Sequence, residues 1–126
     1  MQIITSSKAP APIGPYNQAV IHNGILYMSG QIAIDPATGN MVLDNIQTET
    51  HQVMRNLQAV LEAAGTNFNK AIKTTIFLSD MQLFAQVNEV YGSYFTANFP
   101  ARETVAVKTL PRNVNIEVSI TAVIAL

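Results

Sequence analysis

Apolar residues recur along this chain with two periods, and the longer period predicts two helices. A stripe with steps of three and four residues follows Asp44 and Asn45, either of which can cap a helix, and Gly65 can end it. A second stripe follows the capping pair Ser79-Asp80 and stops before Pro100. The stripes consist of Ile46, Val53, Met54, Leu57, Val60, Leu61 and Ala64 in the first helix, and Phe84, Val87, Tyr91, Tyr94 and Phe95 in the second.

Alternating and β-branched stretches predict five strands. Asn23-Gly24 is typical of a type I′ turn, which makes the first two strands a hairpin. The prolines between Ala9 and Pro15 exclude a helix or central strand and indicate an ordered loop or edge arm. The predicted strands are 18–22, 25–30, 72–78, 103–108 and 115–125; in the last, Ile116, Val118, Ile120, Ala122 and Ile124 face one way, and Asn115, Glu117, Ser119 and Thr121 the other.

These elements indicate one α+β domain over residues 1–126. Two helices can cover only one face of a sheet. Because 48% of the residues are hydrophobic, we expect the other face to be buried against copies of the same chain, with a small-ligand cleft at the interface. A two-layer monomer with one solvated sheet face is the alternative.

Charge and composition exclude several function classes. The net charge is −1 and the pI is near 6, which argues against a nucleic-acid binder. The sequence has no run of 18 apolar residues and its N-terminus does not resemble a signal peptide, so we expect no membrane span and a cytoplasmic location. Without cysteine, the chain has no disulfide or thiolate chemistry.

Two charged residues stand out as candidates for chemistry. Arg102 lies between the second helix and a strand, where its planar guanidinium can bind a carboxylate in a bidentate manner. The alternative is a surface arginine or a salt bridge with Glu103. Glu117 lies between Ile116 and Val118, where a carboxylate is costly to bury unless it is paired. It either forms a structural ion pair or belongs to a site.

Other polar residues carry weaker signals. Tyr16 ends the segment Ile13-Gly14-Pro15-Tyr16, and Asn88 lies at the edge of the second apolar stripe, where its amide can serve a site or a backbone loop. His22 and His51 lack the spacing of a metal site, and His51 is expected to be solvated because it lies off the first stripe. No phosphate-binding loop or nucleophile elbow is present.

Seven short motifs in order resemble the reactive-intermediate deaminase family, also called the Rid or YjgF-type family, over essentially the whole chain. The motifs are Ile13-Gly14-Pro15-Tyr16, Ser29-Gly30-Gln31-Ile32, Ala63-Ala64-Gly65, Val87-Asn88-Glu89-Val90-Tyr91, Phe99-Pro100-Ala101-Arg102, Leu110-Pro111 and Ile116-Glu117-Val118.

The resemblance implies a fold and an activity. It implies a mixed sheet with two helices packed on one face, similar to chorismate-mutase-like trimers, and a homotrimer with three clefts between subunits. The implied enzyme is a 2-iminobutanoate/2-iminopropanoate deaminase, which hydrolyses 2-imino and enamine acids to 2-keto acids and ammonia. It implies no metal or organic cofactor, and a small-molecule substrate rather than a nucleic acid or membrane as partner.

The resemblance also suggests roles residue by residue. Arg102 matches the arginine that grips the substrate carboxylate, and Glu117 the acid that orients the attacking water. Tyr16 and Asn88 match residues that line the cleft, and Gly30 matches a backbone position near the ligand.

Two positions depart from the family's pattern. Thr104, a further candidate for substrate binding, stands where many relatives have a cysteine, and Ser119 stands where many have a second acid. Glu103 is expected to face away from Arg102, because adjacent strand residues point to opposite faces. The alternatives to the deaminase are a small-carboxylate binding or regulatory protein without turnover, and a translation inhibitor or ribonuclease.

Overall fold

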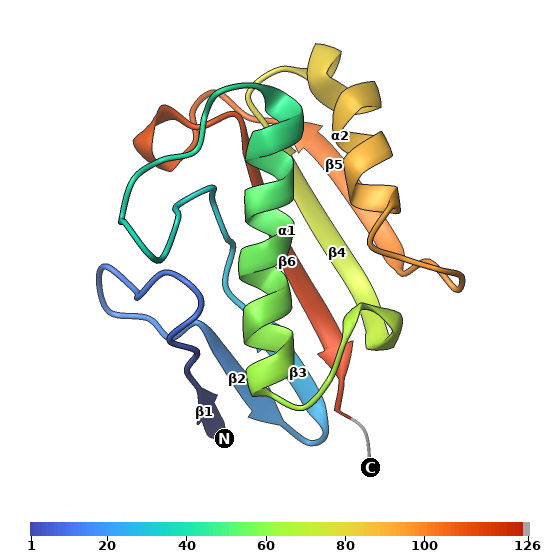
Figure 1. Cartoon of the computed structure of the whole chain (residues 1–126). Coiled ribbons are helices and arrows are strands. Elements are labelled where there is room, and N and C mark those ends of the chain that lie inside the picture. The colour runs from blue at the N-terminus through green and yellow to red at the C-terminus, as the bar shows by residue number, and fades with distance from the viewer. Residues whose placement is uncertain (125–126) are drawn as a thin grey trace.

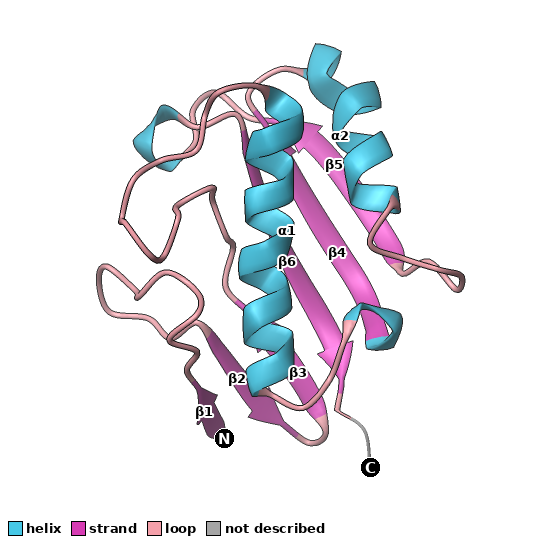
Figure 2. Ribbon diagram, in the orientation of Figure 1, coloured by secondary structure: helices cyan, strands magenta, loops and turns pink. Residues whose placement is uncertain are grey.

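The computed structural model describes residues 1–124, which form a six-stranded mixed sheet with two helices on one face (Figure 1). The strand order is β1-β2-β3-β6-β4-β5, and all neighbours run antiparallel except the parallel pair β4 and β5. The predicted α+β class with both helices on one face is confirmed (Figure 2). The main elements are β1 (Gln2–Ile4), β2 (Ala19–His22), β3 (Ile25–Met28), α1 (Ile46–Ala63), β4 (Ala71–Leu78), α2 (Phe84–Gly92), β5 (Ala101–Ala106) and β6 (Ile116–Val123).

β2 and β3 form the predicted hairpin. Asn23 and Gly24 have φ values of 52° and 77°, as a type I′ turn requires. β1 pairs with β2 and is an addition to the predicted strands, because three residues are too few for a periodic signal. The proline-containing segment after it is a loop, held by the buried Gln18 amide, which donates to the carbonyls of Ser6 at 3.1 Å and Pro10 at 2.8 Å.

α1 begins and ends where the sequence predicts. Asn45 Oδ1 accepts a hydrogen bond from the backbone N–H of Thr48 at 2.8 Å, and Gly65 follows the helix with a φ of 77°. His51 is not solvated as expected: it is half-buried, and its Nδ1 lies 2.9 Å from the hydroxyl of Tyr94. The fully buried apolar residues of the helix are Val53, Met54, Leu57, Val60 and Leu61.

α2 is shorter than the sequence predicts. Asp80 is a cap as expected, but it caps a 3₁₀ turn, Met81–Leu83, that precedes the helix. The helix ends at Gly92, so Tyr94 and Phe95 lie beyond it, although Phe95 is still buried in the core. The backbone N–H groups that follow Gly92 bond to carbonyls three residues back rather than four, and this tighter winding ends the helix.

β6 lies inside the sheet and its side chains alternate as predicted. Glu117 faces the open side, away from the helices, while its strand neighbours Ile116 and Val118 are buried on the side covered by α1. Asn115 was expected beside Glu117 on the open face, and this is wrong. It precedes β6, and its backbone and side-chain N–H groups each donate to the buried Glu49 carboxylate of α1 at 2.8 Å. The predicted strand end at Ala125 lies outside the described residues.

The sheet face opposite the helices is open in the described chain and mixes apolar and polar rows. The registers align Ile3, Val20 and Tyr27 in one apolar row, in which Ile3 and Tyr27 are 55% and 49% exposed. A neighbouring row is polar and joins Ser119, Thr75 and Glu103. The sequence predicts an open face that is semi-polar on the last strand and mostly apolar elsewhere. The structure corrects the second part, because Lys73, Thr75 and Glu103 make β4 and β5 polar on this face as well.

Candidate functional site

Arg102 lies on β5 and points to the helix-covered side of the sheet. It aligns with Thr74 of β4, whose hydroxyl is 2.8 Å from the hydroxyl of Tyr91 in α2, and aligned residues of paired strands share a face. Arg102 Nη1 donates a hydrogen bond to Asn88 Oδ1 at 2.6 Å. The Asn88 amide therefore serves this arginine rather than a backbone loop.

Two aromatic rings complete the surroundings of the guanidinium. Its central carbon lies 5.4 Å from the ring centre of Phe84 and 5.2 Å from that of Tyr91. Burial raises the pKa of Tyr91, so its hydroxyl stays neutral. The cavity beside Arg102, here the Arg102 cavity, has a volume of about 490 Å³ and is lined by Asn88, Tyr91, Gly92, Phe99, Pro100 and Arg102.

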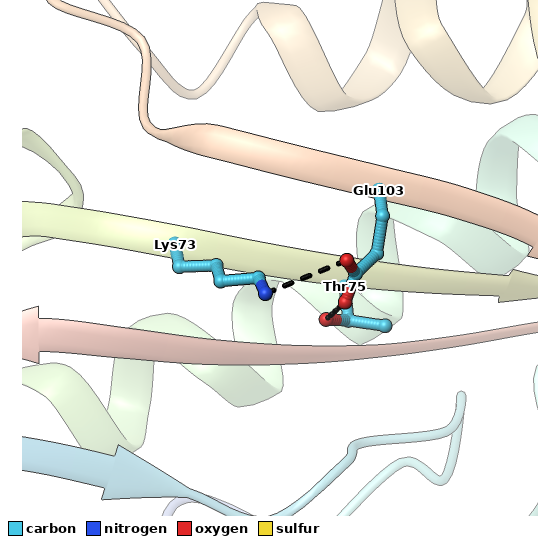
Figure 3. A network of polar contacts seen from close by, with 3 residues as sticks. All are labelled: Lys73, Thr75 and Glu103. Carbon is cyan, nitrogen blue, oxygen red and sulfur yellow. Dashed lines mark hydrogen bonds and ion pairs between the residues drawn. The ribbon is translucent and has the colours of Figure 1, made fainter.

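Glu103 does not pair with Arg102, so the alternative of a salt bridge between them is wrong. Glu103 faces the open side, where Lys73 Nζ lies 3.4 Å from its Oε2 and Thr75 Oγ1 donates to its Oε1 at 2.9 Å (Figure 3). The hydrogen bond from Thr75, followed by the charge of Lys73, lowers the pKa of Glu103. Within residues 1–124 this is the one ion pair, which leaves the Arg102 charge without a carboxylate partner.

Glu117 is half-buried and has neither an ion pair nor a hydrogen-bond partner among the described residues. Burial raises the pKa of its carboxyl group. The cavity that it lines, here the Glu117 cavity, has a volume of about 260 Å³. Its other lining residues are Pro10, Ala11, Ile13, Tyr16, Gln18, Gly30, Gln31, Ile32, Ile34, Pro111 and Arg112.

Gly30 allows the chain to pass close to the Glu117 carboxyl group. A Cβ at position 30 would lie 2.8 Å from Glu117 Cδ, closer than real Cβ atoms approach another carbon. The flanking Gln31 bridges to Val118 of β6, with its N–H 2.8 Å from the Val118 carbonyl, and this fixes the approach. Any side chain at position 30 would displace Glu117 from its place at the cavity.

A single chain does not bring Arg102 and Glu117 together. β4 separates their strands, and Arg102 aligns with Thr74 of β4 whereas Glu117 aligns with Phe77. At about 4.8 Å between strands and about 3.3 Å per residue, their α-carbons lie roughly 14 Å apart, and the two side chains leave opposite faces. Asn88 accompanies Arg102, while Tyr16 and Gly30 accompany Glu117.

Thr104 lines neither cavity. It aligns with the fully buried Ile76 on the helix-covered face, and its Oγ1 is buried without a hydrogen-bond partner. Phe84, Tyr91 and Arg112 are additions to the sequence candidates. Phe84 and Tyr91 could have been found from the sequence, because they are four and three residues from Asn88 and therefore lie on the same side of the helix. No sequence signal marks Arg112.

Two further findings concern the described residues alone. The helices of this part of the chain are too short or too polar to pass through a lipid bilayer. Over the same residues, His, Asp and Glu side chains form no group of three with the proximity that a metal ion needs.

Comparison with known proteins finds relatives over nearly the full chain. The sequence profile of a family described as endoribonuclease L-PSP matches residues 6–124. The 2-iminobutanoate/2-iminopropanoate deaminase of Mus musculus is 43% identical over 122 residues, which are 97% of this chain and 90% of the relative. A RutC family protein of Synechocystis is 48% identical over 126 residues, 98% of this chain and 97% of the relative. The crystal structure of E. coli TdcF with bound serine matches with a TM-score of 0.94 and 36% identity, covering 99% of this chain and 100% of that one.

Proposed function

This chain belongs to the endoribonuclease L-PSP family, the Rid or YjgF-type family that its motifs resemble, and from that premise we propose that it hydrolyses 2-imino acids to 2-keto acids and ammonia. The proposed substrates are 2-iminobutanoate and 2-iminopropanoate, after the name of the mouse relative. The observation that carries the proposal is the state of Arg102: two rings and Asn88 hold its guanidinium beside a cavity, and no carboxylate in residues 1–124 pairs with it.

We propose further that the working site forms between two copies of the chain, in a homotrimer. Arg102 and Glu117 lie on opposite faces, roughly 14 Å apart by strand geometry, whereas the carboxylate and imine carbon of a 2-imino acid are directly bonded. A cyclic arrangement would let the Arg102 cavity of one copy face the Glu117 cavity of the next. The apolar residues on the open sheet face support such an assembly, because burial would remove them from water.

The proposed chemistry divides the work between the two cavities. Arg102 binds the substrate carboxylate through two parallel N–H donors and thereby fixes the neighbouring carbon. Glu117 orients a water molecule toward that carbon and accepts one of its protons. The water oxygen bonds to the carbon, the carbon–nitrogen bond breaks, and the protonated nitrogen leaves as ammonia. Tyr16 is the proposed positioning group or proton donor for the nitrogen.

A small-carboxylate binding protein without turnover is the second candidate. The serine bound in the crystal structure of E. coli TdcF favours it, because serine has a carboxylate but is not an imine. Arg102 alone would suffice for that role. The net charge of −1 counts against the ribonuclease alternative.

Mixed assemblies test both the activity and the shared site. We expect Arg102→Ala and Glu117→Gln each to lower kcat/KM for 2-iminobutanoate by about 10²-fold or more. When the two variants are unfolded together and reassembled, random mixing in a ring should restore both groups in about one cleft in four. The measurement is ammonia release, with Arg55→Ala, an exposed arginine on α1, as the control variant.

The outcomes separate the possibilities. Recovered activity in the mixture supports hydrolysis at a site between copies. If the single variants retain full activity, the roles of Arg102 and Glu117 are wrong. If the parent chain binds 2-ketobutyrate but releases no ammonia from any imine, the binding protein replaces the deaminase.

A further inference from the structure

Arg112 lines the Glu117 cavity and has a backbone conformation that is unfavourable for residues other than glycine. Its φ is 56° and its ψ is 21°, in the left-handed region, and Asn113 follows with a φ of 59°. Residues other than glycine adopt this region at a cost in free energy. Leu110 and Val114, both buried, anchor the turn on either side and hold it in place. Strained residues of this kind cluster at ligand sites, which directs attention to the Arg112 side chain.

The guanidinium of Arg112 has little to bind within the described chain. Its one side-chain contact is from Nη1 to the Met41 sulfur at 3.6 Å, and a thioether is a weak acceptor. No carboxylate within residues 1–124 lies at ion-pair distance from it. Most of its five N–H donors are therefore open to a ligand.

Glu117 shares the cavity with Arg112 but does not pair with it. The Glu117 carboxylate lies beyond ion-pair distance from the Arg112 guanidinium. Both residues line the same cavity of about 260 Å³, so a ligand in it can reach both groups. Ile32, Ile34 and Pro111 supply apolar wall, which suits a short methylene chain and strengthens any ion pair formed there.

A substrate at the site proposed above would extend along this cavity. Its carboxylate would bind Arg102 of one copy and its imine carbon would lie by Glu117 of the next. The rest of the molecule then continues into the Glu117 cavity, with Arg112 at the wall. Resting on that proposed function, we propose that Arg112 selects 2-imino dicarboxylic acids, whose second carboxylate pairs with its guanidinium. The imines of acidic amino acids, 2-iminosuccinate and 2-iminoglutarate, have this chemistry.

The reaction itself is unchanged by this selection. Water adds to the imine carbon, the carbon–nitrogen bond breaks, and a 2-keto diacid and ammonia result. Arg112 binds the remote carboxylate and takes no part in the bond changes. It is therefore a specificity-determining residue, and its loss should alter the choice among substrates.

The test compares four imines, each generated in the assay by an amino-acid oxidase, on the parent chain and three variants. We expect the parent to favour 2-iminosuccinate or 2-iminoglutarate over 2-iminobutanoate and 2-iminopropanoate by about tenfold or more in kcat/KM. Arg112→Gln and Arg112→Gly should lower that ratio by about tenfold, chiefly through KM. Arg55→Gln, at a residue that lines neither cavity, should keep the parent ratio.

The glycine variant separates recognition from folding. Glycine adopts a φ of 56° without strain, so Arg112→Gly should unfold at a urea concentration no lower than the parent does. Calorimetric titration with 2-oxoglutarate and 2-oxobutanoate adds a reading that needs no turnover. Arg112→Gln should weaken the binding of 2-oxoglutarate by about tenfold more than that of 2-oxobutanoate.

The results distinguish this proposal from the one on which it rests. If the parent hydrolyses monocarboxylic imines at least as well, or Arg112→Gln leaves the ratio unchanged, dicarboxylate selection is wrong and the deaminase stands. If no imine is hydrolysed, the proposed deaminase activity is wrong, and the titration alone tests the role of Arg112. If Arg112→Gln then weakens the binding of both keto acids equally, selection of dicarboxylates by Arg112 is also wrong.

Discussion

The fold surrounds Arg102 with partner groups, whereas it leaves Glu117 without any among the described residues. Asn88, Phe84 and Tyr91 fix the Arg102 guanidinium, so little side-chain entropy is lost when an anion binds. Glu117 receives no compensating partner within the described chain, and burial favours its protonated form. A carboxyl group with a raised pKa is better matched to proton transfer near neutral pH than an ordinary one.

The pKa shifts of Glu117 and Glu103 predict opposite effects of pH on stability. The pKa of Glu117 is raised in the folded state, so its contribution is present below the ordinary carboxyl pKa and is lost as pH rises through the raised value. The pKa of Glu103 is lowered, so its contribution is present above the ordinary value and is lost as pH falls through the lowered one. As pH rises from acid to neutral, the free energy of unfolding of Glu117→Gln should therefore increase relative to that of the parent. The free energy of unfolding of Glu103→Gln should decrease relative to that of the parent.

Urea unfolding of both variants between acid and neutral pH, at one protein concentration, measures these differences. Activity gives a second measurement for Glu117. The kcat/KM of the parent should fall as pH decreases on the acid side, and Glu117→Gln should remove this acid-side decrease. Parallel pH trends in the two variants would contradict the assigned shifts.

At the level of elements, Glu49 joins the first turn of α1 to the start of β6. Its carboxylate is fully buried and accepts the backbone and side-chain N–H groups of Asn115, both at 2.8 Å. Asn115 in turn accepts the backbone N–H of Ser79 at the end of β4. This junction sets where β6 begins, and Glu117 is two residues further along.

Removal of Glu49 should therefore destabilise the fold more than removal of an exposed acid on the same helix. Glu49→Ala leaves two partly buried donors of Asn115 without an acceptor and empties a fully buried position, and the free energy of unfolding should fall by about 2–4 kcal/mol. Glu62→Ala, at an exposed position, should change it by less than about 0.5 kcal/mol. Urea denaturation measures both. Equal effects would show that the Glu49 junction contributes little.

At the level of the whole molecule, the open sheet face and the divided site point to the same arrangement. Tyr27 and Val105 on that face are 49% and 46% exposed, although both are large apolar side chains. In the proposed homotrimer, association would bury this surface and bring the two cavities together. The homotrimer, the single domain over residues 1–126, the cytoplasmic location and the site roles stay predictions.

A charge on the open face should separate the copies. Val105 on β5 aligns with Phe77, which aligns with Glu117, so Val105→Glu places a second carboxylate in that row. We expect this variant to sediment as a monomer with unchanged far-ultraviolet circular dichroism, and to lose imine hydrolysis by about 10²-fold or more. Gln58→Glu, exposed on α1, is the matched control and should leave both properties unchanged. A monomeric variant with full activity would refute the shared cleft.

The sequence was a good guide wherever the deciding interactions are local. The end of α2 and the side chain of His51 were not predicted, because the tighter turn after Gly92 and the contact with Tyr94 depend on packing. Arg102, Asn88 and Glu117 could be chosen as candidates from residue type and motif. Their division into two cavities could not, because it depends on which strands lie between them and which faces they occupy.

The sequence by itself determined α1, the presence of α2, the Asn23-Gly24 hairpin and the alternation of β6 from Ile116 onward. Helical period, strand period and positive φ are properties of neighbouring residues, so a short stretch of chain contains the whole signal. Only the tertiary structure decided that Arg102 donates to Asn88 and that Glu49 accepts from Asn115. Those contacts join residues far apart in the chain, and they follow from sheet order, register and the placement of the helices.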